Sequence, residues 1–347
     1  MPTPEFQLAF LAKLQRLFNE GEFAATYKFA LLMAMTELAV EEGGDDGRPL
    51  WLTTKALATK FIALYWQQTA PYSSGMSDTD AAVLAQNKGP QAAVVRAIAD
   101  FRHSRPGVTL ATLATTSGFA DLVTAVARTV AAQPVRYLQN LGGGTEAFLY
   151  ESQRGGIQLL PGVAFCLRRF QPLITQLCRA HWVQHIKVNV LNLPLLGRHD
   201  DLEGFLFETP RQSLLKIGEG LRKLTGGHCF YCGGTVAEAD VDHFLPFSLY
   251  PRDLAHNFVL AHPACNRSKS DMLAARVHLS RWRSYVDRHQ GDLLQIAADA
   301  GRAGDLQASL AVTRWGYRSA VSSSAMAWRQ SRGYEVVTPD YLELLTA

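Results

Sequence analysis

Soft metal ligands occur in two pairs in the last third of the chain. Cys229 and Cys232 are separated by two residues, and His262 and Cys265 repeat that spacing. Thiolate and imidazole groups spaced in this way are typical of tetrahedral zinc sites, and glycines at 233–234 permit the tight turn that such a site needs. A Cys3His set has no open coordination position, so we expect a structural Zn²⁺ that holds two short segments together. The other interpretation makes His262 only the start of a helix and leaves three cysteines.

Ligands of a harder kind lie between these pairs. Asp242 and His243 are adjacent at the end of a predicted strand, 241–244, that stops at Pro246. A carboxylate binds hard divalent cations, and a histidine can take a proton from water near neutral pH. Neighbouring side chains of a strand point to opposite faces, so Asp242 and His243 can reach one metal centre only where the strand is distorted.

A second strand and a helix are predicted after this pair. Residues 258–260 form an apolar run directly after Asn257, and Pro263 is typical of the first turn of a helix. On that helix Asn266 and Lys269 are three residues apart and share a face. Asn266 lies in the first turn, where backbone amides favour an anion. The segment is therefore predicted to fold as two strands and a helix.

These residues, in this order, resemble the HNH endonucleases, a family built on a ββα-metal finger, in its zinc-containing form. The resemblance covers about residues 226–275 and rests on Cys229-x-x-Cys232, Asp242-His243-x-x-Pro246, Asn257, His262-x-x-Cys265-Asn266 and Lys269. It implies that His243 is the general base and that Asp242 and Asn266 bind a catalytic divalent ion. It also implies that Asn257 ties the hairpin loop and orients the histidine. Many members have histidine where this chain has Asn266, and an amide oxygen is a weaker ligand, so the preferred ion stays open.

A finger of this family would hydrolyse phosphodiester bonds. The resemblance implies DNA as the partner, a catalytic Mg²⁺ or another divalent ion such as Mn²⁺ or Ni²⁺, and a role in bacterial restriction or phage defence. Lys269 or Arg267 could hold a neighbouring phosphate, although both cations also suit an ordinary solvated helix face. The alternatives are a zinc-stapled nucleic-acid-binding or scaffold module without catalysis, and an RNA endonuclease.

The composition is that of an ordinary globular chain. Its 347 residues are 48% hydrophobic and 19% charged, with no apolar run of membrane-spanning length and no signal-peptide pattern, so we expect a cytoplasmic protein with no membrane partner. Three of the five cysteines lie in the predicted finger, which indicates metal binding in a reducing compartment; Cys166 and Cys178 are expected to pack in the core. Residues 211–290 hold 11 Lys and Arg against 7 Asp and Glu. This local positive surplus suits a phosphate backbone, although it is small enough to arise by chance.

The predicted fold class is mainly α with a small α+β insert. We divide the chain into a mainly helical domain of unknown role (1–215), the HNH finger (216–275) and a helical C-terminal segment (276–347) that packs on the finger or on the first domain. A finger of this size reads little sequence by itself. The flanking parts are therefore expected to position substrate, to gate the finger, or to bind a regulatory protein partner or a second copy in a homodimer, although no residue demonstrates a dimer.

Apolar residues at three- and four-residue spacing predict the helices. The predicted helical ranges are 4–40, 55–67 with Thr53 or Thr54 as its cap, 79–132 with a turn at 104–107, 162–186, 274–286 and 290–332. Loops are predicted at 43–49, 73–78 and 139–145, and residues 147–150 and 156–160 are predicted to pair as strands.

Three other patterns are interpreted as structural. Residues 142–145 lack the lysine of a nucleotide-binding loop. His181 and His185 are four apart, but Trp182 stands where a zinc protease has its glutamate. Residues 53–61 match an ordinary amphipathic helix better than a DNA-binding helix.

Overall fold

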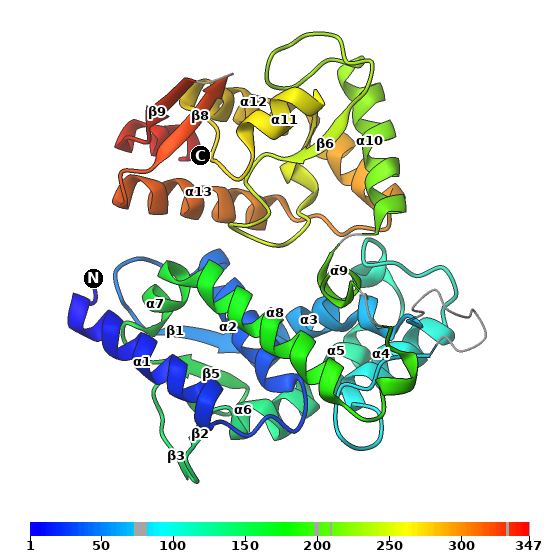
Figure 1. The fold of residues 1–347 in the computed structure, drawn as a ribbon, viewed down its shortest axis with the longest axis vertical. Coiled ribbons are helices and arrows are strands. Elements are labelled where there is room, and N and C mark those ends of the chain that lie inside the picture. The colour runs from blue at the N-terminus through cyan, green and yellow to red at the C-terminus, as the bar shows by residue number, and fades with distance from the viewer. Residues whose placement is uncertain (73–81, 198–200, 209, 331–332, 347) are drawn as a thin grey trace. The chain divides into compact units, whose positions relative to one another are not determined.

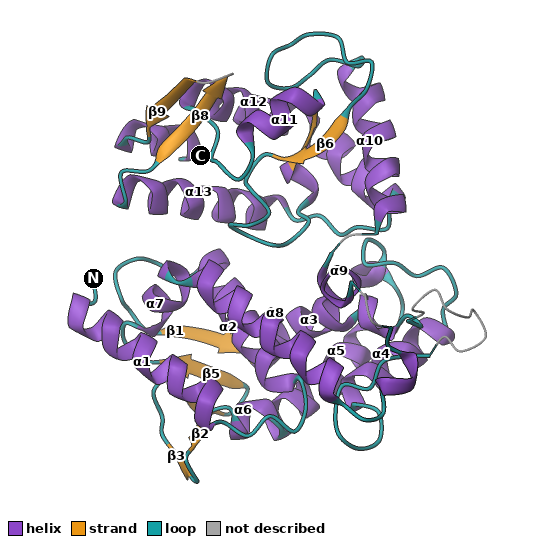
Figure 2. Ribbon diagram, viewed as in Figure 1, coloured by secondary structure: helices purple, strands orange, loops and turns teal. Residues whose placement is uncertain are grey.

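The computed structural model describes residues 1–72, 82–197, 201–208, 210–330 and 333–346. The chain divides into two compact units (Figure 1): unit 1 comprises 1–108 with 115–208, and unit 2 comprises 109–114 with 209–347. Each unit is mainly helical and carries small sheets of two or three strands (Figure 2). The mainly helical fold class is confirmed, while the division into three domains stays a prediction.

Unit 1 is built around one buried helix. Its helices are α1 (Pro4–Glu20), α2 (Tyr27–Glu42), α3 (Thr54–Tyr65), α4 (Ala93–His103), α5 (Phe119–Ala132), α6 (Pro134–Tyr137), α7 (Val163–Arg169), α8 (Gln171–Val188) and α9 (Leu202–Phe207). Residues 27–40 of α2 are all buried, and α2 packs against α3, α7 and α8. Apolar burial on every side of α2 explains why the dense apolar pattern predicted this helix.

Several predicted helix boundaries in unit 1 are confirmed. Thr53 caps α3, because its side chain accepts a hydrogen bond from the backbone N–H of Ala56. The helical region predicted after residue 162 is present as α7 and α8, which are divided at Phe170 just before a proline. Cys166 and Cys178 are fully buried, as expected of core cysteines.

The helix predicted across 79–132 is wrong over much of its length. Among the described residues, 82–92 and 108–118 are mainly loops and turns, and only α4 and α5 are long helices in this region, while the turn predicted at 104–107 is present. Gly89-Pro90, Pro106-Gly107 and Gly118 interrupt the chain, and Gly107 and Gly118 have positive φ. The loop predicted at 73–78 lies outside the described residues.

Two small sheets complete unit 1. Strands β1 (Leu50–Thr53), β5 (Gly156–Leu159) and β4 (Tyr150–Gln153) form one antiparallel sheet in that order. The strand predicted at 156–160 is present as β5, but its partner β4 begins at Tyr150, where the predicted strand 147–150 ends, and β1 was not predicted. Strands β2 (Asn140–Leu141) and β3 (Gly144–Thr145) form a tight hairpin where a loop was predicted. The turn between them needs Gly142 and Gly143, whose φ angles are +56° and +87°.

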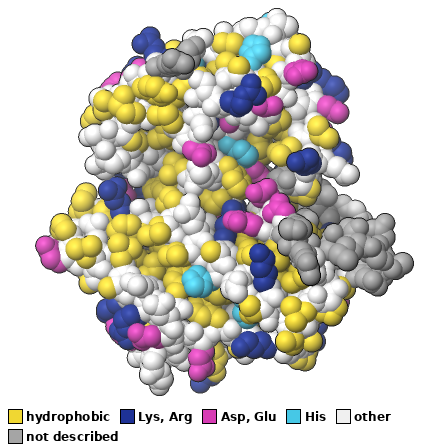
Figure 3. All heavy atoms as spheres, viewed as in Figure 1, with side chains coloured by type: hydrophobic (Ala, Val, Ile, Leu, Met, Phe, Trp, Pro, Cys, Tyr) yellow, Lys and Arg dark blue, Asp and Glu magenta, His cyan; other side chains and the backbone are white. Residues whose placement is uncertain are grey.

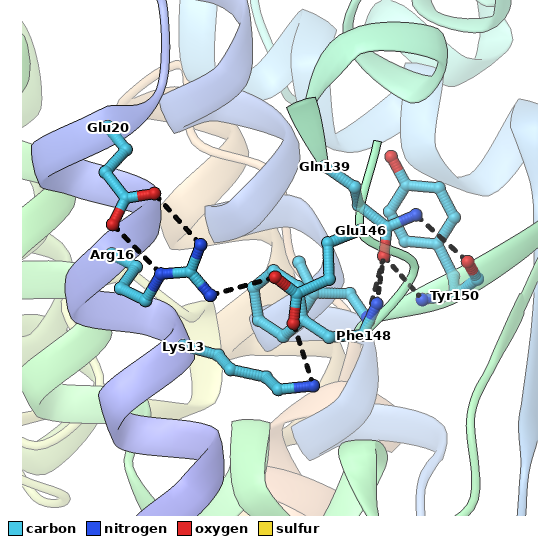
Figure 4. Close-up of polar contacts among 8 residues, drawn as sticks. Lys13, Arg16, Glu20, Gln139, Glu146, Phe148 and Tyr150 are labelled. Carbon is cyan, nitrogen blue, oxygen red and sulfur yellow. Dashed lines mark hydrogen bonds and ion pairs between the residues drawn. The ribbon is translucent and has the colours of Figure 1, made fainter. Parts of the chain in front are cut away.

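Polar contacts tie this hairpin region to α1 (Figure 4). Glu146 binds both Lys13 at 3.0 Å and Arg16 at 2.9 Å, and Arg16 also pairs with Glu20. The side-chain oxygen of Gln139 accepts hydrogen bonds from the backbone N–H groups of residues 148–150 (Figure 4). A single buried amide therefore holds the chain as it enters β4.

Unit 2 contains the segment with the metal-binding motifs. Its helices are α10 (Arg211–Thr225), α11 (Pro263–Lys269), α12 (Arg276–Asp299) and α13 (Leu306–Ser322), and its strands are β6 (Asp240–His243), β7 (Phe258–Ala261), β8 (Met326–Gln330) and β9 (Gly333–Val336). β6 pairs with β7, and β8 with β9, in two antiparallel hairpins. The predicted two strands and helix are thus present as β6, β7 and α11.

The helix predicted to continue through residues 325–329 is wrong, because this segment is strand β8. This strand pairs with β9 and also bonds to a distant segment: the backbone N–H of Trp328 donates to Leu273 O and its carbonyl accepts from Ala275 N, both at 2.7 Å. Trp328 is fully buried. This tertiary pairing overrides the helical spacing of the segment's apolar residues.

The surface in Figure 3 shows hydrophobic side chains scattered among charged ones. On the face drawn there, the described Lys and Arg side chains lie at separate places rather than in one continuous stripe. Among the described residues no helix is long and apolar enough to cross a membrane.

Candidate metal centre and catalytic finger

The four predicted zinc ligands converge. The ligand atoms of Cys229, Cys232, His262 and Cys265 all lie within 4.8 Å of one another, and no other such group was found among the described residues. His262 presents Nδ1 to this cluster, 3.2 Å from Cys232 Sγ, while its Nε2 lies 3.1 Å from the carbonyl oxygen of Thr235. A second hydrogen bond of this kind sets the orientation of a metal-binding imidazole. Three sulfurs and one nitrogen fit Zn²⁺.

Backbone hydrogen bonds shape the turn that carries the first pair. The N–H of Gly233 donates to Cys229 O and the N–H of Cys229 donates to Gly234 O, both at 2.9 Å. Gly233 has a φ of +74°, a conformation that other residues rarely adopt. Gly233 and Gly234 therefore form the tight turn that was predicted after Cys232.

The thiols of this cluster affect one another. Burial and the neighbouring sulfurs of Cys229 and Cys232 raise the pKa of Cys265 to about 12. Although burial opposes ionisation of Cys229, backbone N–H groups lower the pKa of that thiol to about 7. Zinc binding would release the proton of Cys265, and it is therefore favoured by rising pH.

A side chain of helix α12 binds the turn that carries Cys229 and Cys232. One guanidinium nitrogen of Arg281 donates to the carbonyl oxygens of Phe230 and Tyr231, both at 2.6 Å. The N–H of Phe230 donates to Leu260 O in β7 at 2.8 Å, and this bond joins the turn at Cys229–Cys232 to the β6–β7 hairpin. The metal cluster, the hairpin and α12 thus form one connected body.

Asn257 closes the loop between β6 and β7. Its side chain accepts from the backbone N–H of Leu245 at 2.6 Å and donates to the carbonyl oxygen of the same residue at 2.8 Å. Its own carbonyl accepts from Phe244 N at 2.8 Å. Asn257 is 3% exposed, so these contacts are shielded from water. This is the geometry expected of a residue that ties the hairpin loop; its effect on His243 stays a prediction.

Two acidic residues of β6 face helix α11. Asp240 and Asp242 alternate along the strand and share a face. Asp240 accepts from the side-chain amide of Asn266 at 3.0 Å. Asp242 pairs with Lys269, whose Nζ lies 3.1 Å from its Oδ2. Asp240 and Asp242, two residues apart on β6, therefore contact Asn266 and Lys269, three residues apart on α11.

The pair of Asp242 and Lys269 is buried. Lys269 is 0% exposed and also donates to the backbone carbonyl of His243 at 2.9 Å. Asp242 accepts a further hydrogen bond from the hydroxyl of Tyr231 at 2.5 Å. Burial lowers the pKa of Lys269, and the charge of Asp242 opposes that shift. Burial also raises the pKa of Tyr231, and the Asp242 carboxylate adds to that shift, so the hydroxyl remains a donor.

This arrangement changes the candidates for substrate contact. Lys269 would have to leave its buried partners to reach a phosphate. Arg267 is exposed on the same helix and has no such constraint. We therefore keep Arg267, and no longer Lys269, as a candidate contact to nucleic acid.

His243 lies on the other side of the strand. The register of β6 with β7 is regular from Asp240 to His243, so the distortion that would bring Asp242 and His243 to one centre is absent. His243 Nε2 lies 2.7 Å from Oδ1 of Asp253, a residue of the loop between the strands. The imidazole also contacts the rings of Phe247 and Phe258, with centroids 5.2 and 5.0 Å away.

A catalytic divalent ion would find oxygen donors at the β6–α11 interface. Asp242 and Asn266 offer the carboxylate and amide oxygens that hard cations accept. Both oxygens of Asp242 already interact with Lys269, however. Ion binding at Asp242 therefore requires Nζ of Lys269 to give up at least part of this contact.

Comparisons with known protein families match two segments of the chain. Residues 8–190 match the family described as a domain of unknown function (DUF8808), which covers more than half of the sequence, so the chain belongs to this family. Residues 229–275 match the HNH endonuclease family, and this match confirms the resemblance for that segment. No curated protein and no solved structure gave a match. An HNH segment suggests nuclease activity and nucleic-acid binding.

Three site residues were missed in the sequence, one of them Asp240, which accepts a hydrogen bond from Asn266. Tyr231 lies between the first two zinc ligands, and its type alone gave no indication of a contact with Asp242. Asp253 lies ten residues after His243, in a loop with no regular pattern. The only sign of this contact in the sequence was an acidic residue in the loop that follows the strand with His243. Acidic residues are common in solvent-exposed loops, so this sign is weak.

Proposed function

We propose that this protein is a metal-dependent endonuclease that hydrolyses DNA phosphodiester bonds. The observation that carries the proposal is that His243, Asn257 and Asn266 occupy a ββα finger that matches the HNH endonuclease family. Zn²⁺ held by the Cys3His cluster is assigned a purely structural role, because the four ligands leave no open position.

His243 is proposed to act as the general base. It takes a proton from water, the water oxygen forms a bond to phosphorus, and the bond from phosphorus to the 3′ oxygen breaks. The leaving oxygen takes a proton from solvent. A divalent ion such as Mg²⁺, Mn²⁺ or Ni²⁺, held by Asp242 and Asn266, would stabilise the negative charge that develops on the phosphate. Arg267 would bind an adjacent phosphate.

This mechanism makes one demand on the finger. Asp242 and His243 leave β6 on opposite faces, so the end of the strand must turn for both to serve one phosphate.

The buried ion pair between Asp242 and Lys269 favours a second candidate function. A finger whose Asp242 stays paired with Lys269 would be a zinc-stapled nucleic-acid-binding module without catalysis. In that case the protein would bind DNA, yet no divalent ion would induce cleavage.

The test is cleavage of nucleic acid by zinc-loaded protein. Supercoiled plasmid and a structured RNA are incubated in parallel with Mg²⁺, Mn²⁺ or Ni²⁺, and zinc content is measured before and after. EDTA can remove the structural zinc as well as the catalytic ion. The informative comparison is therefore whether the added divalent ion restores cleavage in protein that has kept its zinc. We expect ion-dependent plasmid nicking. Binding without nicking under every ion would support the second candidate, and cleavage of RNA alone would replace DNA as the substrate.

A further inference from the structure

Asp253 is placed to control the proton on His243. Its carboxylate oxygen is 2.7 Å from Nε2 of the imidazole, and the side chains of Asp253 and His243 are 11% and 20% exposed. A hydrogen bond this short between partly buried groups is among the stronger polar contacts in a protein. The charge of Asp253 also acts on Arg302, where it opposes the lowering of the arginine's pKa by burial.

A carboxylate can only accept in this contact, so the Nε2 atom of a neutral His243 carries the hydrogen. The lone pair then resides on Nδ1. No hydrogen bond to Nδ1 from another described residue was found, and the rings of Phe247 and Phe258 limit rotation of the imidazole. The free lone pair is what a general base presents to water.

We propose that Asp253 is a positioning residue that holds His243 as the Nε2–H tautomer, with Nδ1 directed at the water to be deprotonated. This inference rests on the proposed nuclease function and adds to it a residue from the loop between β6 and β7. Asp253 itself touches neither phosphate nor ion in this role. Its effect should therefore appear in the rate of the chemical step and not in substrate binding.

Nitrogen NMR of histidine-labelled protein tests the tautomer independently of activity. At alkaline pH, where imidazole is neutral, the shifts of the two ring nitrogens distinguish Nε2–H from Nδ1–H, and His243→Ala identifies the relevant signal. We expect Nε2–H in the wild type and a mixture or the other tautomer in Asp253→Asn, whose amide can also donate. A wild-type His243 that carries its hydrogen on Nδ1 would overturn the proposal, even in a preparation that cleaves nothing.

Kinetics give the second readout. Asp253→Asn should lower kcat by roughly 100-fold, because it impairs the general-base contribution, with KM changed by less than about twofold. Asp253→Glu should recover part of the loss. The matched control is Asp292→Asn, which removes an exposed carboxylate 3.2 Å from another histidine, the half-buried His289. Wild-type kcat in Asp253→Asn, or an equal loss in the control, contradicts the proposal. An inactive wild type contradicts the proposed function instead.

Discussion

Asn257 shows how one side chain can close a loop. Its amide oxygen and nitrogen bind the N–H and carbonyl of Leu245, and both residues are almost fully buried. The backbone groups of Leu245 have no access to water that could replace these contacts. The asparagine was predicted from the family resemblance, whereas its partner became known only from the structure.

We expect Asn257→Ala to lower the free energy of unfolding of unit 2 by about 1–3 kcal/mol, because it leaves buried backbone groups without partners. The matched control is Asn266→Ala, which removes one hydrogen bond from a half-buried side chain. The free energy of unfolding of both variants is measured by denaturant titration, with hydrogen exchange of unit 2 amides as the readout. An equal or larger loss in the control would show that the loop does not depend on Asn257.

At the scale of elements, the interface between β6 and α11 is organised by a buried ion pair. Lys269 and Asp242 face each other across it, and Tyr231 donates to the same carboxylate. Removing one partner of a buried pair leaves the other charge without compensation, whereas removing both is far less costly. The strand and helix therefore depend on these side chains as a pair.

Lys269→Met is expected to destabilise unit 2 by about 3–5 kcal/mol, and Asp242→Asn combined with Lys269→Met by clearly less than the sum of the single changes. A double-mutant cycle from denaturant unfolding measures the coupling. Lys216→Met, on an exposed position of α10, is the control and should have little effect. Additive losses would mean that the pair contributes no mutual stabilisation.

The elements show which features a single sequence can predict. β6, β7 and α11 were predicted because their signals are local: a short apolar alternation, Asn257, and a proline at the first helical turn. β1 was missed because its pairing partner is far along the chain, at 156–159. β8 was missed although its partner β9 is local, because its apolar residues have helical spacing and its backbone also bonds to the distant residues 273 and 275. The zinc ligands could be predicted from paired spacing, but the contact of Asp253 with His243 depends on how the loop folds.

At the scale of the whole molecule, the candidate metal ligands found among the described residues all lie in one unit. The Cys3His cluster lies in unit 2, while the part that matches the domain of unknown function lies in unit 1 except for residues 109–114. The free energy of binding a structural zinc is also folding free energy for the segments that it joins. Loss of zinc should therefore act on unit 2.

Chelation of zinc, or Cys232→Ser, should lower the unfolding temperature of unit 2 and the protection of its amides against hydrogen exchange, with unit 1 amides unchanged. Cys178→Ser supplies the opposite control, because it places a hydroxyl in the core of unit 1 and leaves the zinc ligands intact. Calorimetry together with hydrogen exchange distinguishes the two units. Unchanged protection in unit 2 after complete zinc removal would argue against a structural role for the cluster.

Whether His243 is required for phosphodiester hydrolysis on this finger can be measured with a plasmid nicking assay. Wild-type protein and His243→Ala are compared at equal zinc content and equal thermal stability, with the divalent ion that gives the highest activity. We predict ion-dependent conversion of supercoiled to nicked plasmid by the wild type, and a loss of at least about 100-fold in the variant. Equal nicking by both proteins, or none by the wild type with any ion, would contradict the account.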